Sequence, residues 1–376
     1  MELFREIDNR IIKLIKTLQG NGYETYIVGG AVRDLLLNVT PKDYDIATSA
    51  SPEEICKCLG RRNTMIIGKR FRLVHYRMGQ EIIEISTFRA NPISAKQDKV
   101  RNKVKNLADK PEKMIFDDNN FGTSKEDAFR RDFTVNAIFY DPVSDKIIDH
   151  TGMGLKDIQN KVVRVIGDGY LRFEEDPVRM LRALKLVGQF DFSMDSHTEN
   201  ALFASLDKLP HVSTSRMTLE LEKILASCYG DKILEAFHDF GLLPYFLPFF
   251  AENWDTPEME RALDLLCERN IRVSNNIYRN SISLAMATLL LPFAQTEYET
   301  ARKCHKNVKI HYITSELTNT AFKPQTMVKR LLFSAEKILN SHLSQKNPSY
   351  RERGNKHANE LLNIIICCDR NNNAPQ

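Results

Sequence analysis

Apolar and polar residues follow two different periods along the chain. In the N-terminal part, short apolar or alternating segments broken by glycine predict strands at Tyr26–Val28, Thr64–Ile67, Phe71–Met78, Glu81–Phe88 and Val162–Ile166. From Asp176 onward, apolar residues recur every three or four positions, which predicts helices. We therefore expect an α+β fold with a mixed head (residues 1–150), a helical neck (151–228) and a helical body with a frayed tail (229–376).

The head also contains predicted helices and one long segment without periodicity. The first 18 residues have the spacing of an amphipathic helix, and Pro52–Leu59 follows Ser51, a suitable N-cap. Ser124–Asp132 is expected to form a helix of mixed charge, followed by an apolar segment, Phe133–Tyr140. Residues 90–120 are rich in Lys, Asn and Asp, which indicates a functional loop or a disordered segment.

A pair of glycines joins the first predicted strand to a helix. In the sequence YIVGGAVRDLLL, Gly29 and Gly30 form the turn and the helix covers Ala31–Leu37, including Arg33 and Asp34. Glycines at such a turn leave room for a phosphate near the backbone, and the free N–H groups of the helix start point toward it. This segment is therefore a candidate phosphate-binding turn.

Two aspartates, Asp43 and Asp45, follow in the sequence KDYDIATSA. On a strand, side chains two positions apart point to the same side, so we expect these two carboxylates to project together. Two such carboxylates can hold a pair of Mg²⁺ ions about 4 Å apart, as in phosphoryl transfer. Most Asp-x-Asp sequences are solvated turns, and it is the upstream strand, Gly-Gly and helix that favour a metal site here.

Two further clusters carry groups suited to a nucleotide. In RRDFTVNA, Arg131 can neutralise a triphosphate, Asp132 can bind a metal or a ribose, and Asn136 can bond to a sugar hydroxyl. In EEDPVRMLRALK, Asp176, Arg179 and Arg182 recur at three-residue steps and should share one side of a helix. Together they offer an acceptor and donors that can pair with the edge of a base.

Charge and cysteine usage narrow the class of protein. Lysine and arginine number 53 against 49 acidic residues, but residues 301–356 hold twelve basic and three acidic residues, a pattern suited to a phosphate backbone. The seven cysteines lack zinc or redox spacing, so neither structural disulfides nor a zinc site is expected. No apolar run is long enough to span a membrane and the N-terminus is too charged for a signal peptide, so we expect a cytoplasmic protein.

The sequences GGAVRD, KDYDIATSA, RRDFTVNA and EDPVRMLRA together resemble the motifs of the class II nucleotidyltransferases, the bacterial poly(A) polymerases and tRNA CCA-adding enzymes. The resemblance is close over residues 23–190. It implies a polymerase-beta-like nucleotidyltransferase head, Mg²⁺ as cofactor, and ATP and an RNA 3′ end as partners. It also implies that Asp43 and Asp45 are the metal ligands.

The resemblance assigns roles to the other motif residues. The third catalytic carboxylate is either Glu84, in EIIEISTFR, or Asp132. The implied nucleotide-binding residues are Gly29, Gly30, Arg33, Asp34, Arg131, Asn136, Asp176, Arg179, Arg182 and Lys185. Family members commonly carry Arg at the position of Lys185, and an ammonium group cannot form the forked contact that a guanidinium makes with phosphate.

The shared motifs do not separate the two activities of the family. The segment IGKRFRLVH, residues 67–75, resembles a signature of bacterial poly(A) polymerases, which favours adenylate addition to RNA 3′ ends over CCA addition to tRNA. A catalytically silent RNA-binding protein is a third hypothesis, disfavoured because Asp43 and Asp45 are both present. His238-Asp239 is reminiscent of a phosphohydrolase metal doublet but lies in an amphipathic helix without partner ligands.

Overall fold

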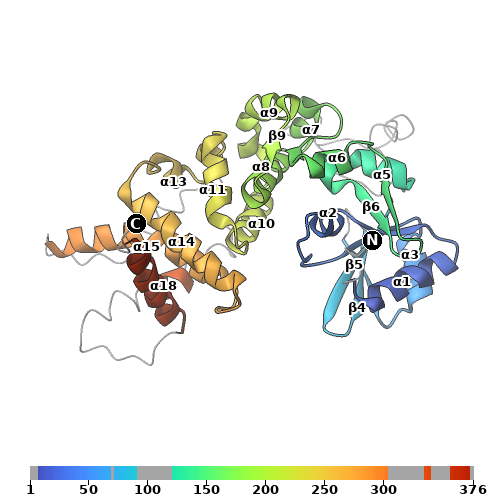
Figure 1. The fold of residues 1–376 in the computed structure, drawn as a ribbon, viewed down its shortest axis with the longest axis horizontal. Coiled ribbons are helices and arrows are strands. Elements are labelled where there is room, and N and C mark those ends of the chain that lie inside the picture. The colour runs from blue at the N-terminus through green and yellow to red at the C-terminus, as the bar shows by residue number, and fades with distance from the viewer. Residues whose placement is uncertain (1–6, 69–71, 91–120, 304–333, 340–355, 373–376) are drawn as a thin grey trace, which may run out of the picture. The chain divides into compact units, whose positions relative to one another are not determined.

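The computed structural model describes residues 7–68, 72–90, 121–303, 334–339 and 356–372. By its internal contacts the chain divides into two compact units, one of residues 1–179 and 192–202 and the other of residues 180–191 and 203–376. The division falls within helix α8 (Val178–Phe190), not between residues 150 and 151. The division into head, neck and body therefore stays a prediction. The mixed α and β composition of the head and the helix-rich remainder are confirmed (Figure 1).

A seven-stranded sheet forms the centre of the first unit, in the order β3-β4-β5-β2-β1-β6-β7. All neighbours are antiparallel except β2 and β5, which are parallel. The strands are β1 (Thr25–Val28), β2 (Asp45–Thr48), β3 (Thr64–Ile67), β4 (Leu73–Met78), β5 (Glu81–Thr87), β6 (Ile138–Asp141) and β7 (Lys146–Asp149).

Helices cover this sheet and extend it. The helical elements of the first unit are α1 (Asn9–Gly20), α2 (Gly30–Leu36), α3 (Pro52–Leu59), α5 (Ser124–Arg130), η2 (Thr134–Asn136), α6 (Gly154–Gln159) and α7 (Gly169–Glu175). Two short parallel strands, β8 (Val162–Val163) and β9 (Ser193–Met194), pair beside α6, and α9 (Ser196–Phe203) follows. A core of Val28, Ala47, Phe88, Ala137 and Phe139 packs beneath the strand ends that carry the candidate site.

Local sequence explains where these helices begin. Ser51 caps α3 as predicted, and it forms a capping box with Glu54, which satisfies two backbone N–H groups at the helix start. Thr123 and Glu126 form the same box at α5. Both helices therefore start at fixed residues.

Several predicted boundaries were wrong. The helix predicted to Asp132 ends at Arg130, because Arg131 adopts an extended conformation. The apolar segment 133–140 is interrupted by the 3-10 turn η2, so β6 begins only at Ile138. The strand predicted over Val162–Ile166 is two residues long. Helical structure begins at Gly169 with α7, earlier than predicted, because Asp168 accepts bonds from the N–H groups of Tyr170 and Leu171.

Helices make up the second unit. They are η3 (Leu206–His211), α10 (Thr214–Leu225), α11 (Gly230–Asp239), α12 (Leu243–Phe246), α13 (Pro248–Glu252), α14 (Pro257–Ser274), α15 (Ile282–Lys303) and α18 (Lys356–Asn372), together with most of α8 and a turn at 334–339. In the part of the chain that the structure describes, no helix has both the length and the apolar character needed to cross a bilayer. The predicted segments at 90–120 and 301–356 lie almost wholly outside the described residues.

Helices α8 and α11 approach closely at Gly188. A Cβ atom there would lie 2.6 Å from the carbonyl oxygen of Lys232 and 2.7 Å from the Cα of Ile233. A methyl group at this position therefore has to push the two helices apart.

We predict that Gly188→Ala lowers the free energy of unfolding by about 1–3 kcal/mol, the usual cost of overpacking. Gly20→Ala is the matched control, because nothing lies within 4 Å of a Cβ at Gly20, the last residue of α1. It should leave stability unchanged or raise it by up to about 1 kcal/mol. Urea denaturation of both variants is the measurement, and equal stability of the two would contradict the close approach.

Candidate active site

The site is organised around Asp45, the first residue of β2. In the antiparallel pair with β1 it lies opposite Val28, the residue just before the Gly29–Gly30 turn. In the parallel pair with β5 it lies opposite Glu84. The strand that was expected to contain both aspartates begins only at Asp45, and Asp43 precedes it.

Asp45 has an unusual electrostatic environment. The packing of protein around its carboxyl group is the main cause that raises its pKa, although the residue keeps contact with solvent. Repulsion from Asp43 and then from Glu84 raises it further, and Arg131 opposes them, so that the pKa of Asp45 is about 6. Asp43 and Glu84 are therefore both close enough to Asp45 to act on its charge.

This arrangement fits a divalent cation. Hard cations prefer carboxylate oxygens, and Mg²⁺ is commonly held by one or two carboxylates together with substrate phosphates and water. Among the described residues no group of three His, Cys, Asp or Glu side chains forms a complete metal site. The crowding that raises the pKa of Asp45 would be relieved by a positive charge placed among the three carboxylates.

The turn beside Asp45 requires glycine. Gly29 has φ +75°, and a Cβ there would lie 3.1 Å from Nη1 of Arg131. Arg131 is held in that place by Asp127, whose Oδ2 accepts bonds from Nε and Nη2 at 3.1 and 2.9 Å. Nη1 of Arg131 also donates to the carbonyl of Asn136 at 3.3 Å. The guanidinium thus lies directly against the Gly29 backbone, at the start of α2.

A second chain of hydrogen bonds connects α2 to the turn η2. Nε and Nη2 of Arg33 donate to Oδ1 of Asp34 at 2.9 and 2.6 Å, and its Nη1 donates to Oδ1 of Asn136 at 2.7 Å. Nδ2 of Asn136 in turn donates to Oδ1 of Asp132 at 3.2 Å. The structure therefore brings the residues predicted from GGAVRD and RRDFTVNA into one network, which runs from Asp34 through Arg33 and Asn136 to Asp132.

The motif EEDPVR forms a joint between α7 and α8. Oε2 of Glu175 accepts bonds from Arg172 at 3.0 Å and from Arg179 at 3.3 Å. Nη2 of Arg172 donates to the carbonyls of Arg130 and Arg131 at 2.5 and 2.6 Å, at the C-terminal end of α5. Carbonyls at a helix end have no partner within the helix, so Arg172 satisfies two of them and holds the RRD sequence in place.

Asp176, Arg179 and Arg182, which were predicted to share one side of a helix, have different surroundings. Asp176 caps α8 by accepting a bond from the N–H of Val178 at 3.3 Å. Arg179 is buried, and its Nη1 donates to the carbonyl of Arg172 at 2.7 Å. Arg182, further along α8, is half-exposed and belongs to the second unit.

Lys185 and Arg182 converge on a carboxylate that the sequence did not reveal. Glu220 on α10 is buried, and its oxygens lie 3.7 Å from Nζ of Lys185 and 4.0 Å from Nε of Arg182. Burial works against ionisation of Glu220, but Lys185, Lys223 and Arg182 outweigh it and lower its pKa. Burial lowers the pKa of Lys185 to about 8 in spite of the attraction of Glu220.

Four residues of these networks were not assigned roles from the sequence: Asp127, Arg172, Glu175 and Glu220. Asp127 precedes Arg131 by four residues, and Glu175 lies three after Arg172 and four before Arg179, spacings that allow ion pairs on a helix. Those spacings could have indicated both carboxylates. Glu220 is distant in sequence from Lys185, so no local pattern could have found it.

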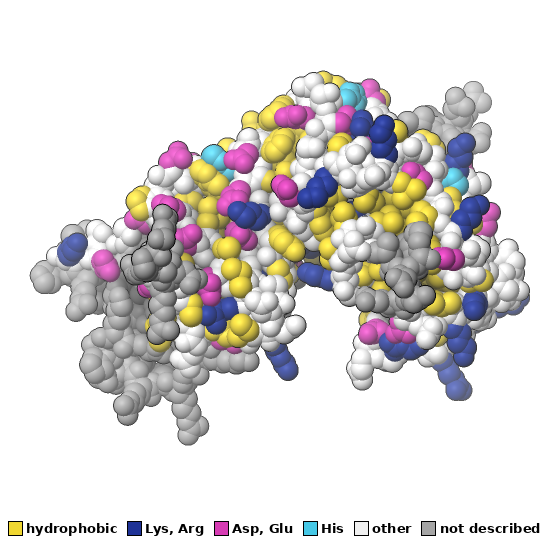
Figure 2. Space-filling model, in the orientation of Figure 1, with side chains coloured by type: hydrophobic (Ala, Val, Ile, Leu, Met, Phe, Trp, Pro, Cys, Tyr) yellow, Lys and Arg dark blue, Asp and Glu magenta, His cyan; other side chains and the backbone are white. Residues whose placement is uncertain are grey.

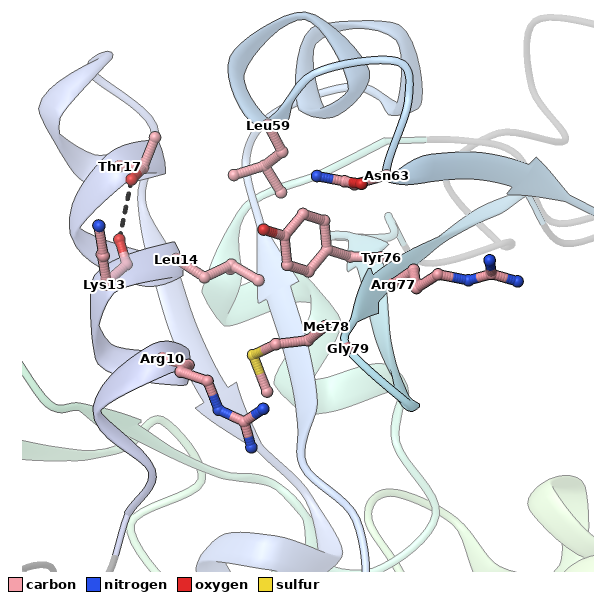
Figure 3. Close-up of a pocket in the computed structure, with 10 residues that line it drawn as sticks. All are labelled: Arg10, Lys13, Leu14, Thr17, Leu59, Asn63, Tyr76, Arg77, Met78 and Gly79. Carbon is pink, nitrogen blue, oxygen red and sulfur yellow. Dashed lines mark hydrogen bonds between the residues drawn. The ribbon is translucent and has the colours of Figure 1, made fainter.

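A pocket of about 520 Å³ lies elsewhere in the head, between α1, the end of α3 and β4 (Figure 3). Leu14, Leu59, Tyr76 and Met78 point toward one another there, while Arg77 points away. Because Tyr76 and Met78 alternate with His75 and Arg77 along β4, this pocket is on the opposite face of the sheet from Glu84, which pairs with His75. None of the predicted site residues lines it.

Two family models match the chain. One, described as "Poly A polymerase head domain", matches residues 25–164, and the other, "Probable RNA and SrmB- binding site of polymerase A", matches residues 191–253. The chain belongs to the poly(A) polymerase and CCA-adding enzyme family. The boundaries of the first match enclose the Asp45 site and both hydrogen-bond networks around it.

Individual members of the family are similar over most of the chain. Poly(A) polymerase I of Haemophilus influenzae is 34% identical over 295 residues, which are 77% of this chain and 64% of the relative. Poly(A) polymerase I of Escherichia coli O6:H1 is 35% identical over 80% of this chain and 63% of the relative. The CCA-adding enzyme of a Geobacillus species is 38% identical over 66% of this chain and 57% of the relative. The chain thus spans somewhat less than two thirds of the poly(A) polymerase I relatives.

Solved structures of the family share the fold. The CCA-adding enzyme of Bacillus stearothermophilus in complex with CTP is 28% identical, covers 75% of this chain and 69% of its own, and gives a TM-score of 0.56. A tRNA-processing enzyme in an apo form gives a TM-score of 0.61 over 97% of this chain and 88% of its own, at 22% identity. These similarities confirm the expected nucleotidyltransferase head and helical remainder.

We predict that Asp45→Asn stabilises the metal-free protein at pH 7. The raised pKa of Asp45 means that its ionised form destabilises the folded state, fully so above about pH 6 and less as the pH falls toward 4. The variant should therefore melt at a higher temperature than the wild type at pH 7 and at the same temperature near pH 4. Melting curves in EDTA test this, and a variant that is less stable at both pH values would contradict it.

Added Mg²⁺ provides the second half of this test. It should raise the melting temperature of the wild type at pH 7 and have a much smaller effect on Asp45→Asn, because a ligand that binds only the folded state stabilises it by mass action. An equal response of both proteins would remove Asp45 from the metal site.

We also predict that Arg172→Lys lowers the free energy of unfolding by about 1–3 kcal/mol. Lysine keeps the charge but cannot reach Glu175 and two carbonyls at once, so buried acceptors lose their partners. Lys232→Arg, an exposed change on α11, is a control and should be neutral within about 0.5 kcal/mol. Urea denaturation measures both, and a neutral Arg172→Lys would show that the joint contributes nothing to stability.

Proposed function

We propose that this protein is a template-independent RNA nucleotidyltransferase that adds adenylates from ATP to RNA 3′ ends. The observation that supports it most directly is the position of Asp45, between the Gly29–Gly30 turn on one side and Glu84 on the other. That position offers a phosphate-binding turn and a crowded set of carboxylates within one small region. The similarity to poly(A) polymerase I over 77–80% of the chain supports the choice of adenylate.

Asp43 and Asp45 would hold the Mg²⁺ ions, and we propose Glu84, rather than Asp132, as the third carboxylate. Glu84 lies opposite Asp45 in the sheet and raises its pKa, whereas Asp132 accepts bonds from Asn136 and from the N–H of Phe133. When bound, the metal pair lowers the pKa of the attacking 3′-hydroxyl and stabilises charge on the leaving pyrophosphate.

The triphosphate is proposed to bind at the start of α2. The first backbone N–H groups of α2 have no partner within the helix, and the guanidinium of Arg131 lies against the Gly29–Gly30 turn that opens it. Arg33 lies one turn into α2 and is oriented by Asp34 and Asn136. These residues would hold the phosphates in one orientation, which is most of what phosphoryl-type transfer requires of a protein.

Selection of the base is proposed to involve α8. Asp176 offers an acceptor and Arg179 and Arg182 offer donors, and the Glu175–Arg172 joint fixes the start of the helix relative to the RRD sequence. Lys185 would add a weaker contact than the arginine found in many family members. Asp132 and Asn136 would support the sugar and the orientation of Arg33.

The runner-up is addition of CCA to tRNA. CCA-adding enzymes are 36–38% identical to this chain over 62–66% of its length, and one structural relative is a complex with CTP. The signature that favours adenylate addition, residues 67–75, lies partly outside the described residues. We propose RNA as the partner in either case, and a cytoplasmic location.

Charge on the surface does not by itself locate the RNA. On the face shown in Figure 2, Lys and Arg side chains are interspersed with Asp and Glu over the described residues. This agrees with the small excess of basic residues in the whole sequence. The RNA therefore has to be located from the geometry around Asp45.

A direct assay separates the candidates. Purified protein is incubated with an unstructured RNA and with tRNA lacking CCA, each with ATP alone, CTP alone and both. We predict long tails from ATP alone. Termination after CCA, dependent on CTP, would favour the runner-up, and absence of any product with all substrates would favour a silent RNA-binding protein.

Asp43→Ala should lower the rate of addition by at least about a hundredfold, since metal-ion catalysis contributes several kcal/mol and each 1.4 kcal/mol is a factor of ten. Asp239→Ala is the matched control, because Asp239 is exposed at the end of α11 and its carboxylate pairs with the adjacent His238. Circular dichroism should show both variants folded. A folded and fully active Asp43→Ala protein would overturn the metal role.

A further inference from the structure

The outer half of the sheet has one face on which, among the described residues of the first unit, large apolar side chains remain exposed. On the other face of β3, β4 and β5, residues such as Val74, Ile83 and Ile85 are buried, and α3 packs against these strands. On the first face, Met65 is 62% exposed and Ile82 is 56% exposed. Large apolar side chains so exposed, on a regular sheet, are typical of a surface that binds something.

Strand register connects this face to the candidate active site. Met65 pairs with His75, His75 pairs with Glu84, and Glu84 pairs with Asp45. Paired residues share a face, so these four side chains form one row from the edge strand β3 to β2. Ile82 lies two residues before Glu84 and pairs with Arg77, which places both in a neighbouring row on the same face.

The in-line geometry of nucleotidyl transfer indicates which substrate would lie against this face. The proposed triphosphate site lies on the β1 side of Asp45, where Val28 leads into Gly29 and Gly30. In transfer of this kind, the attacking and leaving oxygens are roughly in line on opposite sides of the phosphorus. The 3′-hydroxyl must therefore approach Asp45 from the β5 side.

We propose that Met65, His75, Arg77 and Ile82, here called the β3–β5 surface, bind the 3′-terminal nucleotides of the RNA beside Glu84. This rests on the proposed function and adds the location of the RNA end. A single RNA strand is the occupant, because the surface is continuous with the catalytic carboxylates and reaches them along one row of side chains.

The chemistry of the surface fits such a strand. Met65 and Ile82 offer apolar contact to the faces of bases and riboses. Arg77 is exposed and makes no ion pair within residues 7–68, 72–90 and 121–303, so its guanidinium is available to a backbone phosphate. Nε2 of His75 lies 3.3 Å from Oε1 of Glu84, which holds the glutamate within the row. Apolar contact and one cation do not distinguish base edges, so the 3′-terminal base should matter little.

Variants of the surface test the proposal. Met65→Ser combined with Ile82→Ser should raise the KM for RNA about tenfold and leave the KM for ATP within about twofold, because the RNA end loses apolar contacts that ATP does not make. Arg77→Gln should weaken RNA binding and reduce the slope of log affinity against log salt by about 0.7. Val143→Ser, an exposed change at the β6–β7 turn, is the matched control and should alter nothing.

Two measurements do not depend on activity. Fluorescence anisotropy with a single-stranded oligonucleotide, without ATP, should show the loss of affinity directly. RNA with 4-thiouridine as its last nucleotide should cross-link, on irradiation, to a peptide that contains Met65 or Ile82. Absence of nucleotide addition by the wild type would defeat the proposed function, while these two measurements would still decide about the surface.

Other outcomes would overturn the proposal. Unchanged RNA affinity and KM in the folded double variant would show that the RNA end binds elsewhere. If the variant instead lost self-association in sedimentation while RNA binding remained intact, the surface would be an interface between copies of this chain. Cross-linking confined to peptides outside β3, β4 and β5 would also contradict it.

Discussion

This site depends on the way β2 pairs with its two neighbours, antiparallel with β1 on one side and parallel with β5 on the other. The antiparallel register with β1 places Asp45 beside the residue that precedes the Gly29–Gly30 turn, and the parallel register with β5 places it beside Glu84. A shift of one residue in either register would turn a carboxylate to the opposite face of the sheet. Ile46 and Ala47 lie on opposite faces of β2 and both are buried, so such a shift would exchange a large and a small side chain between two packed faces, which opposes it.

The head contains two opposite concentrations of charge. Around Asp45, burial and then the charges of Asp43 and Glu84 raise the pKa of its carboxyl group to about 6. On α5, burial and then Arg89, Arg179, Arg172 and Arg131 lower the pKa of Arg130 to about 9. Like charges held close together raise the pKa of a carboxyl group and lower the pKa of a guanidinium, and both shifts have these directions. A magnesium nucleotide carries a cation and a polyanion, so it could relieve both.

Much of this architecture could be predicted from the sequence, because the determining signals are local. The Gly-Gly turn, the cap at Ser51 and the alternation in β5 each lie within a few residues, and the structure has all of them. The length of β2 could not be predicted, since Asp43 and Asp45 have the spacing of a strand whether or not the backbone pairs there. Register and long-range ion pairs also depend on tertiary packing.

The base-selecting segment shows the limit most clearly. The three-residue spacing of Asp176, Arg179 and Arg182 predicted that they share one side of a helix. Arg179 is instead drawn inward by Glu175 and by the carbonyl of Arg172. Arg182 and Lys185 turn toward Glu220, which the chain supplies from α10. A pattern along one helix specifies which residues share a side, but its neighbours decide what each side contacts.

The presence of lysine rather than arginine at position 185 has a consequence for how the protein responds to alkalinity. An arginine there would stay charged at any pH that the fold survives, whereas an amine with a pKa of about 8 is half neutral in mildly basic solution. A neutral amine neither attracts phosphate nor balances Glu220, and it reacts readily with acylating reagents. The attraction that holds Lys185 beside the buried Glu220 therefore weakens as the solution becomes basic.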